Sequence, residues 1–94
     1  MKNSIAPETL LHQATVAERA GRRQLGQNLR RAAELVQVPE SLILEVYNAL
    51  RPRRSTAAEL SALARRLREE YHAPHCARWV DEAAASYFAR GLLR

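Results

Sequence analysis

The sequence predicts an all-α protein, a single small domain (residues 1–94) of four or five short helices. Apolar residues recur at the three- and four-residue spacing of helices, and no run shows the sustained alternation typical of a strand. Prolines divide the chain into segments of helical length. No repeat, low-complexity tract or long linker separates these segments, so we expect one domain.

The first half of the chain predicts two helices. Pro7 and Glu8 suit a first helical turn, because proline needs no amide partner there and a carboxylate meets the positive end of the helix dipole. One apolar face of this helix carries Leu10, Ala14 and Ala17. Gly21 is a natural stop. The next segment carries an amphipathic stripe that ends before Pro39 and consists of Leu25, Leu29, Ala32, Ala33 and Val36.

A third, shorter helix is predicted from Pro39 and Glu40 to just before Pro52, since the residue that precedes a proline avoids helical geometry. Its residues available for burial are Leu42, Ile43, Val46, Tyr47 and Leu50. The basic segment 51–54 then connects it to the next helix.

The second half predicts two more helices. Thr56 and Glu59 form a capping-box signature, and the helix behind them carries the stripe Leu60, Leu63, Ala64, Leu67 and Tyr71. Pro74 starts a last helix that runs to about Gly91. Its broad apolar stripe, which suits either a core or a docking surface, consists of Trp79, Val80, Ala83, Ala84, Tyr87 and Phe88.

Composition limits the classes of protein to consider. Cys76 is the only cysteine, which excludes an internal disulfide and favours a reducing compartment. We see no secretory signal and no apolar stretch of membrane-spanning length, so we expect a soluble, cytoplasmic protein with no membrane partner. So short a chain forms a small core, and a partner surface is a natural source of further stability.

Chemistry that would make the chain an enzyme on its own is sparse. His72, His75 and Cys76 are close in sequence and of metal-ligating type, but Pro74 separates the histidines and no second ligand pair is near. Three glycines cannot build a phosphate-binding loop. We therefore expect no catalytic, cofactor-binding or metal-binding residue in this chain.

The net charge of +5 raises nucleic-acid binding as an alternative function. Four arginine clusters lie at 22–23, 30–31, 51–54 and 65–68. Glutamates are interspersed among them, and no helix combines arginine with the amide side chains that read base edges. Arginine is also common in protein interfaces, where its planar fork pairs with carboxylates. A helical protein-docking domain is therefore favoured, with a small basic DNA- or RNA-binding protein as the alternative.

Three sequence blocks add a family resemblance. They are Arg30-Arg31-Ala32-Ala33-Glu34-Leu35, Tyr47-Asn48-Ala49-Leu50-Arg51-Pro52, and Arg54-Ser55 followed by Glu59-Leu60, with Pro39 between the first two. Together they resemble the small (gamma) subunit of adenosylcobalamin-dependent propanediol and glycerol dehydratases. The last helix is similar as well, so the resemblance covers about residues 28–90.

The resemblance implies a non-catalytic subunit of a heterohexameric lyase that converts a 1,2-diol to an aldehyde and water. Large and medium subunits would be its partners, and adenosylcobalamin would lie between those two and not on this chain. The resemblance also allows a bacterial microcompartment as an alternative location to the cytoplasm, although family members often carry a longer extension before the first helix than this sequence does.

The same resemblance gives the conspicuous residues a role. We expect polar contacts to the large subunit from Tyr47, Asn48, Arg51 and Arg54, next to Pro52, and an apolar anchor from Trp79 or Phe88. The alternative is that Tyr47 and Trp79 are internal core residues.

Overall fold

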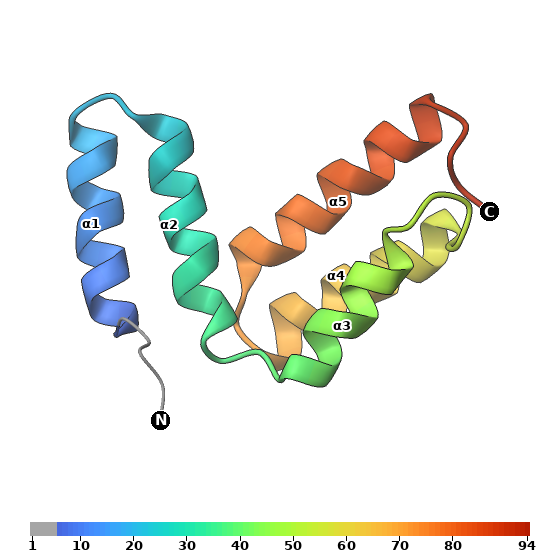
Figure 1. Ribbon diagram of the computed structural model, residues 1–94, viewed down its shortest axis with the longest axis horizontal. Helices are drawn as coiled ribbons and strands as arrows, with labels where there is room; N and C mark the ends of the chain where they lie inside the picture. Colours follow the sequence, from blue (N-terminus) through green and yellow to red (C-terminus); the bar gives the residue numbers. More distant parts are fainter. Residues whose placement is uncertain (1–5) are drawn as a thin grey trace. The chain divides into compact units, whose positions relative to one another are not determined.

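A computed structural model describes residues 6–94, which form five α-helices and no strand (Figure 1). The prediction of an all-α fold is confirmed. The chain divides into two compact units, one up to Gln37 and one from Val38 to Arg94, here called unit 1 and unit 2. That the two units act as one domain stays a prediction. No helix within residues 6–94 is long and apolar enough to cross a membrane.

Unit 1 is a helical hairpin of α1 (Pro7–Arg19) and α2 (Arg23–Leu35) (Figure 1). The turn between them needs a left-handed residue, which Gly21 supplies with a φ of 81°. The backbone amide of Arg22 closes the turn by donating to the carbonyl of Ala17 at 2.8 Å. The predicted helix start at Pro7 and stop at Gly21 are confirmed.

The predicted α2 stripe is buried only in part, since Ala33 is buried and Leu29 and Ala32 are half-buried. Toward the buried side of unit 1, α2 contributes Gly26, Ala33 and Glu34, while Leu25 and Val36 remain 38% and 51% exposed. Small residues allow the two helices to approach closely: a Cβ on Gly26 would lie 2.6 Å from Cγ of Glu18. The buried face of α2 therefore combines one residue of the predicted stripe with Gly26 and Glu34.

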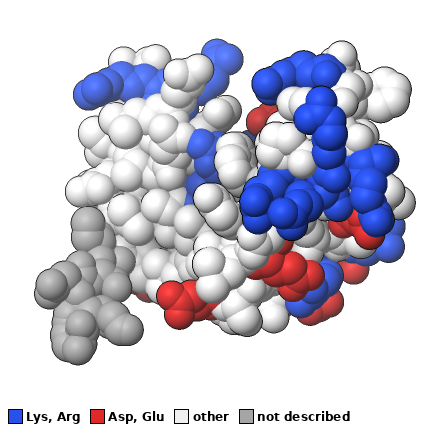
Figure 2. Space-filling model, turned by 45° about the vertical axis from the view of Figure 1, so that its right-hand side comes forward, with Lys and Arg blue, Asp and Glu red and all other residues white. Residues whose placement is uncertain are grey.

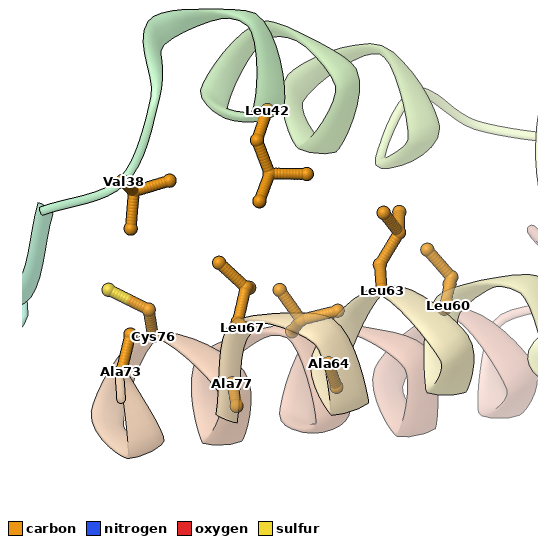
Figure 3. Close-up of a cluster of buried hydrophobic side chains, with 10 residues drawn as sticks. Val38, Leu42, Leu60, Leu63, Ala64, Leu67, Ala73, Cys76 and Ala77 are labelled. Carbon is orange, nitrogen blue, oxygen red and sulfur yellow. The ribbon is translucent and has the colours of Figure 1, made fainter. Parts of the chain in front are cut away.

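Unit 2 consists of α3 (Glu40–Ala49), α4 (Ala57–Glu70) and α5 (Pro74–Ala89). Figure 3 shows its core, in which Val38 and Leu42 point toward Leu63 and Leu67 of α4. The cluster as a whole comprises Val38, Leu42, Leu60, Leu63, Ala64, Leu67, Ala73, Cys76, Ala77 and Val80. The predicted α4 stripe is confirmed at its four leucine and alanine positions, with Tyr71 half-buried.

The capping box at the start of α4 is confirmed. Glu59 donates its backbone amide to Oγ1 of Thr56 at 3.1 Å, and its carboxylate accepts from the amide of Thr56 at 2.9 Å. Two of the backbone amides that would otherwise lack partners at the helix start are thereby satisfied.

The broad apolar stripe predicted for α5 is only partly buried. Val80 is 1% exposed, whereas Trp79 and Phe88 are 46% and 76% exposed. At about 100° per residue, Trp79 and Phe88 project about 180° apart around the helix, so one core cannot cover both. The buried face of α5 instead includes Cys76 and Ala77 in its first turn.

Candidate subunit interface

Six of the seven predicted interface residues lie at one end of unit 2. There α3 ends, α4 begins and the last turn of α5 passes beside them. These six are Tyr47, Asn48, Arg51, Pro52, Arg54 and Phe88, and all are exposed. The structure thus brings together residues that are up to 41 positions apart in sequence (88 − 47).

The α3–α4 turn (residues 50–56) is attached to α5 and to the residues that follow it. Tyr87 donates its hydroxyl to the carbonyl of Leu50. The amide of Arg53 donates to the carbonyl of Leu92 at 2.7 Å. Within the turn, the buried hydroxyl of Ser55 donates to the carbonyl of Ala49 at 2.8 Å. These bonds satisfy helix-end carbonyls and fix the turn's backbone.

Residues 90–94 complete the attachment. The amide of Arg94 donates to the carbonyl of Ser55 at 2.8 Å, and its guanidinium pairs with the carboxylate of Glu59 at 3.0 Å. The amide of Leu92 donates to the carbonyl of Tyr87 at 2.8 Å. Residues 92–94 therefore lie along the α3–α4 turn. The backbone of the turn is hydrogen-bonded both to Tyr87 of α5 and to residues 92–94.

Exposure distinguishes the predicted interface residues at this end from the core residues of unit 2. Tyr47 is 69% exposed and Phe88 is 76% exposed, so neither contributes its ring to the core of unit 2. Trp79 is also exposed, at 46%. The alternative in which Tyr47 and Trp79 are internal core residues is therefore wrong.

Trp79 does not belong to this group. It precedes Phe88 by nine residues, which is about 14 Å along a helix axis, and it projects to the other side of α5. The two aromatic anchors proposed from the sequence cannot enter one pocket, and Phe88 is the one that lies beside the turn.

Some arginines outside the turn form ion pairs inside the chain. Arg30 forms a bidentate pair with Glu18, with both contacts at 2.7 Å. Arg68 pairs with Asp81 at 3.1 Å and links α4 to α5. Arg66 pairs with Glu45 of α3 at 3.4 Å. Several of the predicted basic clusters therefore hold helices together, which weakens the nucleic-acid alternative.

Two of these ion pairs shift the pKa of a member. The hydrogen bond from Arg30 to Glu18 raises the pKa of the Arg30 guanidinium. The pKa of Glu59 is lowered, first by the hydrogen bond from the Thr56 amide and then by Arg94. The carboxylate of Glu59 therefore takes part both in the capping box of α4 and in the ion pair with Arg94.

The histidine and cysteine residues do not gather into a ligand set. Cys76 is buried in the core of unit 2, His72 is exposed at the α4–α5 corner, and His12 lies on α1 of unit 1. Across residues 6–94, no group of three or more His, Cys, Asp or Glu side chains could hold a metal ion.

The sequence placed Tyr87 in the apolar stripe of the last helix and Ser55 in a family-like block, but it predicted no hydrogen bond for either residue and no role for residues 92–94. The available signal for Tyr87 was the need of a partly buried tyrosine hydroxyl for a partner. The identity of that partner, a main-chain carbonyl 37 residues away, has no signature in the sequence.

Comparison with known proteins agrees with these observations. Residues 2–94 match the family model described as dehydratase small subunit. The chain is 54% identical over 90 residues to the propanediol dehydratase small subunit of Citrobacter freundii, and 53% identical to that of Salmonella typhimurium strain LT2. Each match covers 96% of this chain and 52% of the relative, so the chain spans about half the length of the curated relatives it matches. On this evidence the chain belongs to the dehydratase small-subunit family.

Proposed function

We propose that this chain is a non-catalytic small subunit of a coenzyme-B12-dependent diol or glycerol dehydratase. The holoenzyme would convert a 1,2-diol to an aldehyde and water, so the chain would work as part of a lyase. The observation that supports this most strongly is the identity above 50% across nearly the whole chain to two propanediol dehydratase small subunits.

A small subunit has partner subunits by definition, and here we propose the large and medium dehydratase subunits in a heterohexamer. The docking surface on this chain is the exposed end of unit 2 that carries Tyr47, Arg51, Arg54 and Phe88. Its support is physical. Exposed aromatic and arginine residues on a fixed backbone are typical of residues that dominate binding energy in interfaces.

Adenosylcobalamin would be bound by the other subunits. When bound, it supplies the radical chemistry of the dehydration. The residues of this chain would stabilise the assembly, and none of them touches the reacting atoms. We place the complex in the cytoplasm and leave packaging in a bacterial microcompartment as a secondary proposal.

Reconstitution tests this function. The large and medium subunits encoded beside this chain would be expressed with and without it, and aldehyde formation would be measured with adenosylcobalamin and propane-1,2-diol. We expect full activity, and a complex that retains the chain, only when it is present. Equal activity without the chain, together with its absence from the purified complex, would refute the proposal.

A further inference from the structure

The α3–α4 turn carries three arginines whose charge is not used inside the chain. Arg51, Arg53 and Arg54 are exposed, and within residues 6–94 their guanidinium groups form no ion pair. Figure 2 brings forward the side of Figure 1 where this turn lies and shows basic surface gathered there. Other exposed arginines, such as Arg65 and Arg78, also form no ion pair within residues 6–94, so these three are distinguished by their place together on one turn with a bonded backbone.

The backbone beneath these arginines is fixed before any partner arrives. Arg53 donates its amide to Leu92, and Arg94 donates its amide to Ser55. Arg53 also adopts a left-handed φ of 62°, which is unfavourable for a side chain other than Gly, Asn or Asp. An arginine kept in a strained conformation on a fixed turn directs its guanidinium outward without further ordering of the backbone.

The short length of this basic segment and its aromatic neighbours favour protein carboxylates over nucleic-acid phosphates as its binding partner. The three arginines fall within four consecutive residues (51–54), whereas a nucleic-acid site follows a phosphate backbone along an extended basic track. Exposed Tyr47 and Phe88 lie at the same end of unit 2. Guanidinium groups pair bidentately with carboxylates, and such pairs fix the orientation of the partner.

We propose that Arg51, Arg53 and Arg54 form a preformed receptor for a cluster of carboxylates on the large subunit. Tyr87 and residues 92–94 act as positioning residues that hold the turn in its binding conformation. This inference rests on the proposed function and adds the chemistry of the partner's surface.

Charge reversal tests the receptor. The double variant R51E/R54E would be co-expressed with the large and medium subunits, and its affinity for them would be compared with that of wild type. We expect a loss of about tenfold or more, since fully desolvated arginine contacts are typical hot spots. The matched control is R65E, which reverses an exposed arginine of α4 outside the turn and should assemble as wild type does.

The variant R53N removes the third guanidinium while it relieves the strain, because asparagine tolerates the left-handed region. We expect its thermal unfolding midpoint to be at least that of wild type while assembly is weakened. A drop in both quantities would mean that Arg53 acts only in folding, which would overturn its place in the receptor.

Two variants of one residue test the positioning role. R94A removes the ion pair with Glu59 but keeps the amide that bonds to Ser55, whereas R94P removes both. We expect R94P to weaken assembly more than R94A. We also expect R51E/R54E to cost less affinity in the R94P background than in wild type, because the arginines are then already misplaced. V80A, a core variant away from the turn, is the stability control. Additive losses, or an equal loss in V80A, would overturn the positioning role.

Failure of the inference is distinguishable from failure of the proposed function. If wild type assembles and R51E/R54E assembles equally well, the receptor is refuted while the subunit role stands. If wild type does not assemble but binds DNA in a salt-sensitive way, both are refuted.

Discussion

Two polar side chains, Ser55 and Tyr87, fix the backbone at the end of α3 by hydrogen bonds. The last carbonyls of a helix lack intrahelical donors. At the end of α3, the hydroxyls of Ser55 and Tyr87 supply donors to the carbonyls of Ala49 and Leu50. Ser55 is close in sequence to the carbonyl that it caps, whereas Tyr87 reaches Leu50 only because α5 folds back beside the end of α3.

Removal of the capping hydroxyl is expected to destabilise the chain moderately. The substitution Thr56→Ala deletes the acceptor for the Glu59 amide, and loss of such a cap typically costs about 1 kcal/mol of unfolding free energy. Urea denaturation followed by circular dichroism measures this change. Ser61→Ala, at an exposed position within α4, is the control and should leave stability unchanged or slightly raised.

Glu59 is expected to make stability depend on acid pH. Its pKa is lower in the folded chain than its ordinary value, so the unfolded chain binds the proton more readily. The stabilisation is therefore present above the ordinary pKa of about 4.3 and is lost as pH falls through the lower, folded value. Unfolding curves from pH 7 to pH 3 check this. The gap between wild type and E59Q should narrow as pH falls, and a constant gap would contradict the assignment.

Each helix of unit 2 is held by few side chains, and α3 shows this most clearly. Leu42 is its only residue in the buried class, at 2% exposed, while Leu44 two positions later is 57% exposed. We expect Leu42→Ala to lower the unfolding free energy by about 2–5 kcal/mol, because a cavity is left between α3 and α4. Leu44→Ala removes the same atoms from an exposed site and should cost less than about 0.5 kcal/mol. Equal effects of the two substitutions would show that α3 packs differently.

In the hairpin of unit 1, we expect substitutions at Gly26 and Glu18 to have coupled effects on stability. Alanine at position 26 favours a helix by about 1 kcal/mol over glycine, but its Cβ would meet Cγ of Glu18 at 2.6 Å. Displacement of Glu18 also breaks its pair with Arg30. G26A should therefore stabilise the hairpin more in an E18A background than in wild type. Thermal unfolding of the four variants gives the coupling energy, and additivity would contradict the close contact.

Helix boundaries and one core stripe were predictable from the sequence, whereas the buried faces of other helices were not. Pro7, Gly21 and the Thr56–Glu59 pair signal starts and stops through local geometry alone. The stripe on α4 is buried as expected because it packs against both α3 and α5. In α2, by contrast, the ends of the predicted stripe at Leu25 and Val36 are exposed while Gly26 and Glu34 are buried, and a hydrophobic pattern carries no information on a close helix approach at a glycine.

At the scale of the whole molecule, some arginines pair with carboxylates of other helices, and three arginines that form no ion pair within residues 6–94 fall together in the α3–α4 turn. Six of the residues predicted for the interface lie at this end, five of them because they fall within residues 47–54 of the sequence; that they contact another subunit stays a prediction. Phe88 joins them only through the packing of α5 beside the turn. Trp79 was grouped with Phe88 from a stripe that spans about half the helix circumference, which periodicity over ten residues does not resolve.

The central claim is that this chain is a dehydratase subunit that docks through the α3–α4 turn. The most direct test is a structure of the complex formed with the large and medium subunits. The account predicts that Tyr47, Arg51 and Arg54 are buried against the large subunit, with carboxylates facing the arginines. A complex in which these three side chains remain exposed to solvent, while the chain docks through another face, would contradict it.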